Sequence, residues 1–142
     1  MNALGTLLYR HPLIFFHLVT AIAALALGAA ILLRRKGTVS HRALGWAWVA
    51  LMGSTAGASA FIRDYRMPNL AGFTPIHLLT LTVAVLLPLA IWFIRRGNVS
   101  GHRKTMRNLY LGGCIVAGLF TFAPGRFLGS LLWGTPLTGI AS

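Results

Sequence analysis

The chain has 142 residues, of which 56% are hydrophobic and 10% are charged, and its mean hydropathy is +0.74. A soluble domain usually carries about a quarter charged residues, so this composition argues strongly against a water-soluble enzyme. The net charge of +12 comes from thirteen Lys and Arg against one acid, Asp64. Because these cations lie in short clusters between long apolar runs, they are typical of membrane loops and not of a nucleic-acid-binding surface.

Four apolar runs have the composition of membrane-spanning helices, which need about 20 mostly apolar residues. The runs are Leu13–Leu33, Ala43–Ile62, Ile76–Ile94 and Leu109–Ala123. The last run is the shortest, and its helix could begin nearer Lys104. No small-residue cleavage pattern follows the first run, so we interpret it as a retained span and not as a signal peptide. The predicted fold class is therefore an all-α integral membrane four-helix bundle.

Two basic connections set the expected orientation in the membrane. Residues 34–42 join the first two runs, residues 95–107 join the last two, and together they hold nine of the thirteen cations. The positive-inside rule places both connections in the cytoplasm and both chain termini outside. Basic side chains at this surface are also expected to contact anionic lipids. The residues expected to do so are Arg34, Arg35, Lys36, Arg95 and Arg96.

The remaining segments are expected at the membrane surfaces. Trp46, Trp48 and Trp92 are predicted to lie toward the cytoplasmic interface, as aromatic belts do. Residues 63–74 form an expected outer loop, and residues 124–142 form an expected interfacial tail.

The sequence contains an internal repeat. Residues 17–20, His-Leu-Val-Thr, align with residues 77–80, His-Leu-Leu-Thr, and the register continues without a gap to Ser40 over Ser100. One inserted residue, Gly101, then restores the alignment of the next His-Arg pair. The two copies are predicted to be tandem two-helix units.

The repeat predicts a symmetric arrangement within one transmembrane domain, residues 1–142. Repeat one covers about residues 13–62 and repeat two about residues 76–123. Because each unit has two spans, both copies enter the membrane from the same side. Such parallel repeats are related by a pseudo-twofold axis along the membrane normal.

Stripes of small and polar residues follow the expected inner faces of the helices. On the first span the stripe is His17, Thr20, Ala21, Ala24 and Gly28, and on the third it is His77, Thr80, Ala84 and Pro88. The second span carries Gly45, Gly53, Ala56, Gly57 and Ala60, and the fourth begins a stripe with Gly113 and Ala117. Small residues allow close helix packing in lipid, and they also leave room for a flat cofactor.

Four histidines are the candidate cofactor ligands. His17 and His77 are expected at one depth near the outer face, and His41 and His102 at one depth near the inner face. Ionisable residues within spans are functional suspects. Two facing imidazoles would form a bis-histidine haem site that transfers electrons. One Cys, one Asp and no Glu exclude a carboxylate-bridged or cysteine-rich metal site.

A purely structural role for these histidines is the alternative, with each ring bonded to backbone or to its partner. His41 and His102 follow Ser40 and Ser100, which we expect to be helix N-caps. A helix N-terminus suits anions such as a haem propionate or a lipid phosphate, so a second haem at this end is a weaker prediction. His11 has no repeat partner and is expected to be solvent-exposed.

The sequence lacks the usual catalytic motifs, since it has no GxSxG, HExxH or Walker pattern. No acid lies within the spans, which argues against a proton or ion transporter. A cofactor-free accessory subunit of a larger membrane complex is the main rival to an electron carrier. A metal-dependent membrane enzyme is a third possibility.

Three short motifs carry a family resemblance. Residues 73–79, Phe-Thr-Pro-Ile-His-Leu-Leu, residues 102–104, His-Arg-Lys, and residues 124–126, Pro-Gly-Arg, occur in this order. Over about residues 17–134 the chain resembles a bacterial family of small four-span membrane proteins known as predicted membrane proteins of unknown function. The resemblance implies residence in the bacterial inner membrane. The paired histidines also resemble, in architecture alone, the cytochrome b561 and ferric-reductase group, although the inner pair here stands at helix starts.

The predicted function is a small membrane protein that binds haem b and passes electrons near the outer face. His17 and His77 would be the axial iron ligands, and Arg63, Arg66 or Arg126 would pair with the propionates. The expected electron donor is a quinol or another membrane cytochrome.

Overall fold

The computed structural model describes residues 3–62, 75–122 and Gly129, and all regular structure within these ranges is helical. The elements are α1 (Ala3–Arg10), α2 (Pro12–Leu33), α3 (Val39–Phe61), α4 (Pro75–Arg95), α5 (Val99–Leu109), the π-helix η1 (Tyr110–Val116) and α6 (Ala117–Phe120). The expected outer loop and interfacial tail, with Arg63, Arg66 and Arg126, lie outside the described residues.

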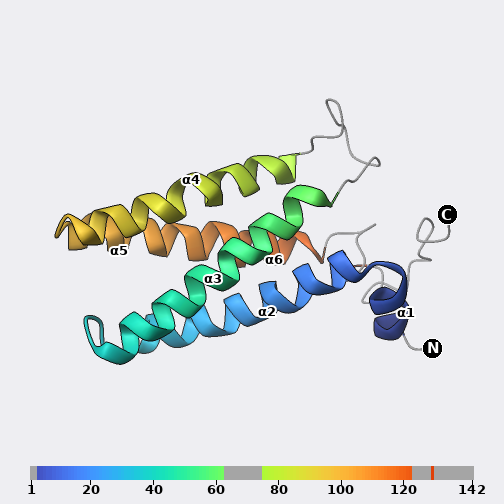
Figure 1. Ribbon diagram of the computed structural model, residues 1–142, viewed down its shortest axis with the longest axis horizontal. Coiled ribbons are helices and arrows are strands. Elements are labelled where there is room, and N and C mark those ends of the chain that lie inside the picture. Colours follow the sequence, from blue (N-terminus) through green and yellow to red (C-terminus); the bar gives the residue numbers. More distant parts are fainter. Residues whose placement is uncertain (1–2, 63–74, 123–128, 130–142) are drawn as a thin grey trace.

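The main helices form an elongated bundle of two hairpins. The first hairpin is α2 with α3, and the second is α4 with the continuous segment α5–η1–α6 (Figure 1). α3 also packs against α4, and η1 packs against α2. In this arrangement α3 lies between α2 and α4, and both α2 and α4 begin at the same end of the bundle (Figure 1). The all-α class and the four main helical segments are confirmed.

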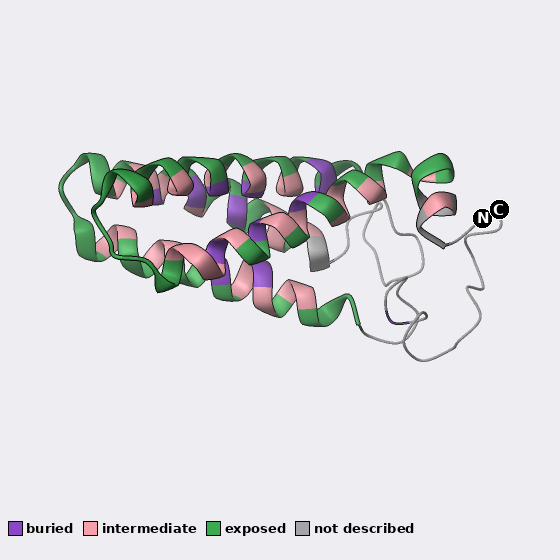
Figure 2. Ribbon diagram, turned by 90° about the horizontal axis from the view of Figure 1, so that it is seen from below, coloured by how far each residue is buried: buried purple, intermediate pink, exposed green. Residues whose placement is uncertain are grey.

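Large apolar side chains cover the outward faces of the helices. Figure 2 shows that buried residues lie between the helices and that exposed residues cover the outside. On α2 and α4 the exposed apolar residues include Leu13, Phe16, Val19, Ile22, Leu78, Leu81 and Val85. An extended apolar exterior of this kind marks a surface that meets lipid or another protein.

Two helices in the described part of the chain are long and apolar enough to cross a membrane, Pro12–Leu33 and His77–Arg95. α3 is not one of them. Its 23 residues are long enough to cross a membrane, but its hydropathy is too low to meet the same criterion. In the fourth segment the regular α-helix is divided by η1.

The helix starts differ from the predicted ones because other residues provide the caps. The side chain of Thr38 accepts a hydrogen bond at 3.1 Å from the N–H three residues on, and Asn98 does the same at 2.8 Å. Each bond satisfies one of the free N–H groups of a helix start. The expectation that Ser40 and Ser100 are N-caps is wrong, since both lie inside helices.

Because α3 begins at Val39 and α5 at Val99, the two basic connections are shorter than predicted. Gly37 and Gly97 adopt φ values of +83° and +74°, a left-handed conformation that favours glycine and closes each hairpin tightly. The predicted start of the last span at Leu109 is wrong, because the helix begins at Val99. Residues 99–107, which we assigned to a loop, are therefore helical.

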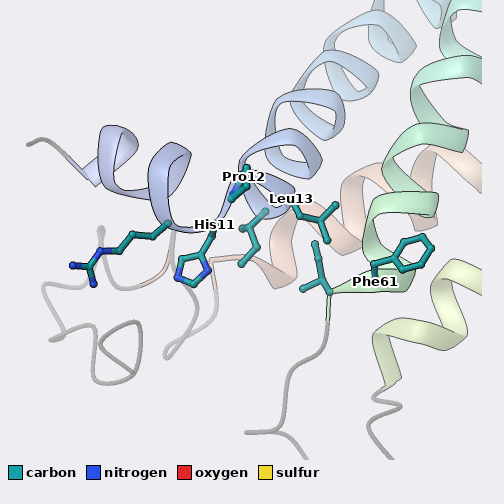
Figure 3. Close-up of a pocket in the computed structure, with 7 residues that line it drawn as sticks. His11, Pro12, Leu13 and Phe61 are labelled. Atoms are coloured by element: carbon teal, nitrogen blue, oxygen red, sulfur yellow. The ribbon is translucent and has the colours of Figure 1, made fainter.

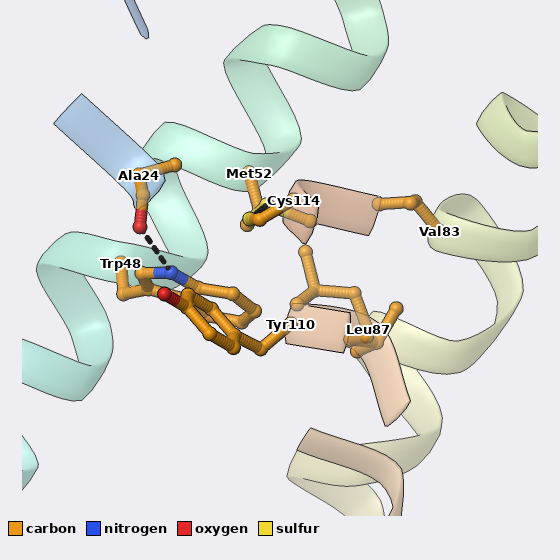
Figure 4. Packing of buried hydrophobic residues seen from close by; sticks show 8 residues of the cluster. Ala24, Trp48, Met52, Val83, Leu87, Tyr110 and Cys114 are labelled. Atoms are coloured by element: carbon orange, nitrogen blue, oxygen red, sulfur yellow. Dashed lines mark hydrogen bonds between the residues drawn. The ribbon is translucent and has the colours of Figure 1, made fainter. Parts of the chain in front are cut away.

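The core is built around a pair of aromatic side chains. Trp48 is 3% exposed, and its Nε1–H donates to the carbonyl oxygen of Ala24 at 2.9 Å (Figure 4). Tyr110 lies beside it, and its hydroxyl donates to the carbonyl of Leu25 at 3.3 Å. The predicted interfacial position of Trp48 is wrong. Trp46 is exposed, as its predicted interfacial position requires.

Gly28 makes this aromatic packing possible. A Cβ at this position would lie 2.5 Å from the Tyr110 ring and 2.8 Å from Nε1 of Trp48. The stripe of Thr20, Ala24 and Gly28 is buried as predicted. Protein side chains fill the space beside Gly28, so this part of the stripe does not form a slot for a cofactor.

Candidate histidine sites

His17 is held in a defined orientation by the neighbouring helix. Its Nδ1 lies 3.0 Å from the carbonyl oxygen of Thr55 on α3. Because a carbonyl only accepts hydrogen bonds, Nδ1 must carry the hydrogen, and in the neutral imidazole Nε2 then keeps its lone pair. This is the orientation that metal-binding histidines commonly adopt.

Hydroxyl side chains lie near His17 on α2 and α3, at Thr20 and Thr55. The Ser59 and Thr80 hydroxyls lie 2.5 Å apart and join α3 to α4. The Thr20 hydroxyl donates to carbonyls of its own helix at 2.9 and 3.1 Å. The Thr55 hydroxyl oxygen is buried and has no hydrogen-bond partner among the described residues. This end of the bundle therefore holds a polar layer across three helices.

His77 does not repeat the environment of His17. It is half-buried near the start of α4, and it shares its helix face with Ala84 and Pro88, which are exposed. α4 packs into the core through Val83 and Leu87 instead. The prediction that the third-span stripe faces the centre is therefore wrong. His17 and His77 lie near the starts of α2 and α4. These two helices begin at the same end of the bundle, with α3 between them (Figure 1).

The α4 stripe lines a lateral groove instead of the core. This groove has a volume of about 330 Å³ and runs between α3 and α4. Its lining residues are Gly53, Ala56, Gly57, Ala60, Thr80, Val83, Ala84, Leu87 and Pro88. Thr80 carries the only polar side chain among them.

His102 is oriented in the same manner as His17. Its Nδ1 lies 2.9 Å from the carbonyl oxygen of Ala90 on α4. The same argument assigns the hydrogen to Nδ1 and leaves the lone pair on Nε2. His102 is half-buried, and it lies one residue before the exposed Arg103.

His41 lies near His102 at the basic end of the bundle. Its ring is half-buried, and its Nδ1 is a buried atom without a hydrogen-bond partner in the described ranges. His41 precedes the apolar part of α3. Burial lowers the pKa of His41, and the nearby charges of His102 and Lys36 lower this pKa further. The structure thus places His41 and His102 at the basic end of the bundle, half-buried and near enough for the charge of His102 to lower the pKa of His41.

The basic end carries nine exposed cations. They are Arg34, Arg35, Lys36, Arg42, Arg95, Arg96, Arg103, Lys104 and Arg107. The only acid of the chain, Asp64, lies outside the described residues, so no described acid neutralises this end. The guanidinium of Arg96 lies 5.4 Å from the centre of the exposed Trp92 ring. This contact fits a tryptophan at a charged membrane interface.

His11 lies apart from both pairs, at the junction of α1 and α2. It is half-buried and not solvent-exposed as predicted. It lines a pocket of about 290 Å³ together with Leu13 and Phe61 (Figure 3). Within residues 3–62 and 75–122 and at Gly129, no three His, Cys, Asp or Glu side chains form a group that could hold a metal ion.

Sequence reasoning missed the groups that orient the histidines. The Thr55 and Ala90 carbonyls are backbone atoms, which no residue type reveals. Tyr110 was also missed, although an aromatic residue opposite Gly28 is a large-to-small pairing that tertiary structure alone identifies.

Comparison with known proteins identifies a family. The family model described as "Predicted membrane protein (DUF2306)" matches residues 14–124. No curated protein and no solved structure matches the chain. The matched segment includes all of the helices from α3 to α6 and most of α2.

Proposed function

The chain belongs to DUF2306, a family of predicted membrane proteins of unknown function, and we propose that it crosses the membrane four times and binds haem b between paired histidines to transfer electrons. In this proposal α2 and α4 are the first and third membrane spans. The second and fourth spans are α3 and the α5–η1–α6 segment. Their small residues and internal hydrogen bonds let them cross beside α2 and α4. We also propose that the two hairpins are tandem repeats.

The orientation of the imidazoles supports haem binding most directly. His17 and His102 each donate Nδ1–H to a carbonyl of the adjacent helix. A fixed Nδ1–H leaves Nε2 as the only ring atom able to bind iron, and it also raises the basicity of that atom. The same bonds also satisfy the ring N–H groups as a purely structural role requires, so the haem proposal rests on the orientation of Nε2.

His41 and His102 form the pair that the geometry supports best. They are half-buried, come from different hairpins and interact electrostatically. The Nδ1 of His41 is buried and has no hydrogen-bond partner within the described ranges. Iron at this pair would need no carboxylate, and the surrounding arginines suit the propionates.

His17 and His77 are the proposed ligands of an outer haem. His17 has the required orientation, but His77 lies on the groove side of α4. Binding at this pair therefore requires α4 to turn about its axis and bring His77 toward the bundle centre. Two occupied sites, one near each end, would carry electrons across the membrane. A quinol or a membrane cytochrome is the expected donor.

The basic end is proposed to face the cytoplasm, with both termini outside. This orientation follows the positive-inside rule and applies to the inner membrane. Arginine and lysine side chains there would contact anionic lipid headgroups. The proposed lipid contacts are Arg34, Arg35, Lys36, Arg95 and Arg96.

Absorption spectroscopy tests the haem proposal. The protein is produced with ample haem and purified in mild detergent, and dithionite-reduced minus oxidised spectra are recorded. Soret and α bands are expected, and His102→Ala should lower the haem-to-protein ratio measured as the pyridine haemochrome. His41→Ala should have the same effect. A colourless wild-type protein would reject the proposal.

A cofactor-free accessory subunit is the second candidate, and open glycine faces favour it. An added Cβ would meet no atom within 4 Å at Gly45, Gly53, Gly57, Gly112 and Gly118. Outward small residues are unused by the bundle and permit a partner helix to approach closely. Co-purification of one stoichiometric membrane partner with colourless protein would support this function over the first.

A further inference from the structure

The nine cations of the basic end form two clusters, one on each hairpin. Four of them flank the turn between α2 and α3, at residues 34–36 and 42, and five flank the turn between α4 and α5, at residues 95–96, 103–104 and 107. Figure 1 shows both turns at the same end of the bundle. No acid lies among the described residues, so each hairpin carries a positive charge there that no described acid balances.

The packing between the hairpins leaves the two clusters facing the same region. The hairpins pack on each other through α3 with α4 and through η1 with α2, whereas α5, which carries three of the cations, packs on its own hairpin against α4 and η1. The clusters are still close enough to interact, because the charges of Lys36 on the first hairpin and His102 on the second both lower the pKa of His41. Like charges from both hairpins therefore meet at this end, which favours an anion that contacts both.

Apolar side chains beside each turn indicate that this anion is a lipid. Leu33 and Val39 bracket the first turn, Ile94 and Val99 bracket the second, and all four are exposed. A dissolved anion would leave these side chains in water, whereas a lipid covers them with its acyl chains and brings phosphate to the cations. Arginine and lysine form strong, charge-assisted hydrogen bonds with phosphate oxygens.

We propose that the basic end binds one phospholipid that carries two phosphate groups on a short linker, as cardiolipin does, and that each phosphate contacts one of the two clusters. The lipid then ties the two hairpins together at this end. This inference rests on the proposed contact of the basic end with anionic lipid headgroups, and it is independent of haem. Once the first phosphate is bound, the linker holds the second at a high effective concentration near the other cluster. A lipid with one phosphate neutralises only one cluster.

Native mass spectrometry of the full chain in mild detergent measures the affinities for cardiolipin and for phosphatidylglycerol. The wild type should bind one cardiolipin about tenfold or more tightly than one phosphatidylglycerol. Two matched double variants neutralise part of one cluster each, Arg35→Gln with Lys36→Gln on the first hairpin and Arg103→Gln with Lys104→Gln on the second. Each should lower the preference for cardiolipin to about twofold, the ratio of the phosphate numbers. Arg10→Gln removes an exposed cation outside both clusters and should keep the full preference.

The outcomes separate the bridging lipid from general lipid contact. Equal wild-type affinities for the two anionic lipids overturn the inference, while tighter binding of both than of neutral phosphatidylcholine still supports the proposed headgroup contacts. Equal binding of all three lipids rejects both proposals. Loss of the preference in only one of the two double variants places both phosphates on one hairpin, and the inference is then wrong.

Inorganic pyrophosphate distinguishes a lipid from a dissolved anion at the same cations. It has two linked phosphates but no acyl chains to cover the exposed apolar side chains, so it should not displace cardiolipin at equal concentration. Displacement at equal concentration would show a site for dissolved anions and overturn the inference. All of these measurements apply equally to colourless protein, so their results do not depend on the haem proposal.

Discussion

The indole N–H of Trp48 donates to the Ala24 carbonyl at 2.9 Å and thereby joins the two helices of the first hairpin in the middle of the bundle. Ala24 is fully buried, and Trp48 is 3% exposed. The second hairpin joins the same contact through Tyr110, whose ring lies beside the indole (Figure 4). This aromatic pair is therefore the centre of the packing that positions the histidines above and below it.

Trp48→Phe tests that contact. The variant keeps an aromatic ring but loses the N–H donor, so we expect the free energy of unfolding to fall by about 1 kcal/mol. Reversible unfolding in mixed detergent micelles, followed by circular dichroism, measures the change. Trp46→Phe is the control, because Trp46 is exposed. Equal effects of the two substitutions would contradict the central role of Trp48.

Gly28→Val should destabilise the bundle more strongly. The new side chain would enter space occupied by Tyr110 and Trp48, and overpacking of a core costs about 1–3 kcal/mol. The same unfolding measurement applies. Gly45→Val provides the comparison, since a Cβ there meets no atom within 4 Å. A stable Gly28→Val protein with an unshifted near-ultraviolet spectrum would show that the aromatic pair packs elsewhere.

His17→Ala should remove the outer haem and leave the inner one. The expected result is a lower haem-to-protein ratio, because the ring that Thr55 orients supplies the iron ligand. Pyridine haemochrome assays and electron paramagnetic resonance of the oxidised protein measure the loss. His11→Ala, which alters a histidine away from both pairs, should keep the full ratio. Retention of all haem signals in His17→Ala would exclude His17 as a ligand.

The lowered pKa of His41 predicts a dependence of stability on pH. The unfolded chain protonates His41 near its ordinary pKa of about 6.5, while the folded chain protonates it only at lower pH. The unfolded state therefore binds more protons below that pH, and the free energy of unfolding should fall as the pH drops from above 7 toward 5.

Denaturation midpoints at several pH values measure this effect in haem-free protein. His41→Asn should flatten the pH profile, since it removes the titrating group. His11→Asn should retain the slope of the wild type. A wild-type profile that rises on acidification would contradict the burial of neutral His41.

Hydropathy predicted the helices better than it predicted their faces. The bounds of α2 match the first apolar run to within one residue, because lipid and core both require apolar side chains there. The cap residues were misplaced because Thr38 and Asn98 are as suitable as the nearby serines. Trp48 was misplaced because an indole suits either an interface or a core with a carbonyl partner.

The candidate site was predicted only in its residue types. The four histidines were evident from their rarity and repetition, but their surroundings depend on which side of each helix packs inward. On α4 the larger Val83 and Leu87 fill the core better than Ala84 and Pro88 do, so the face with the histidine is displaced. The internal repeat did not predict that α2 and α4 would bury different faces, because the volumes of the side chains on α4 decide which face packs inward.

The two tight glycine turns concentrate the nine basic side chains at one end of the bundle. Like charges repel over about 10 Å at moderate ionic strength. Closing each hairpin therefore requires work against this repulsion, and counter-ions must offset the rise in electrostatic free energy. Dissolved anions or lipid phosphates can both fill this role, so the assembly of the hairpins is coupled to the ionic composition of the leaflet in which the basic end lies.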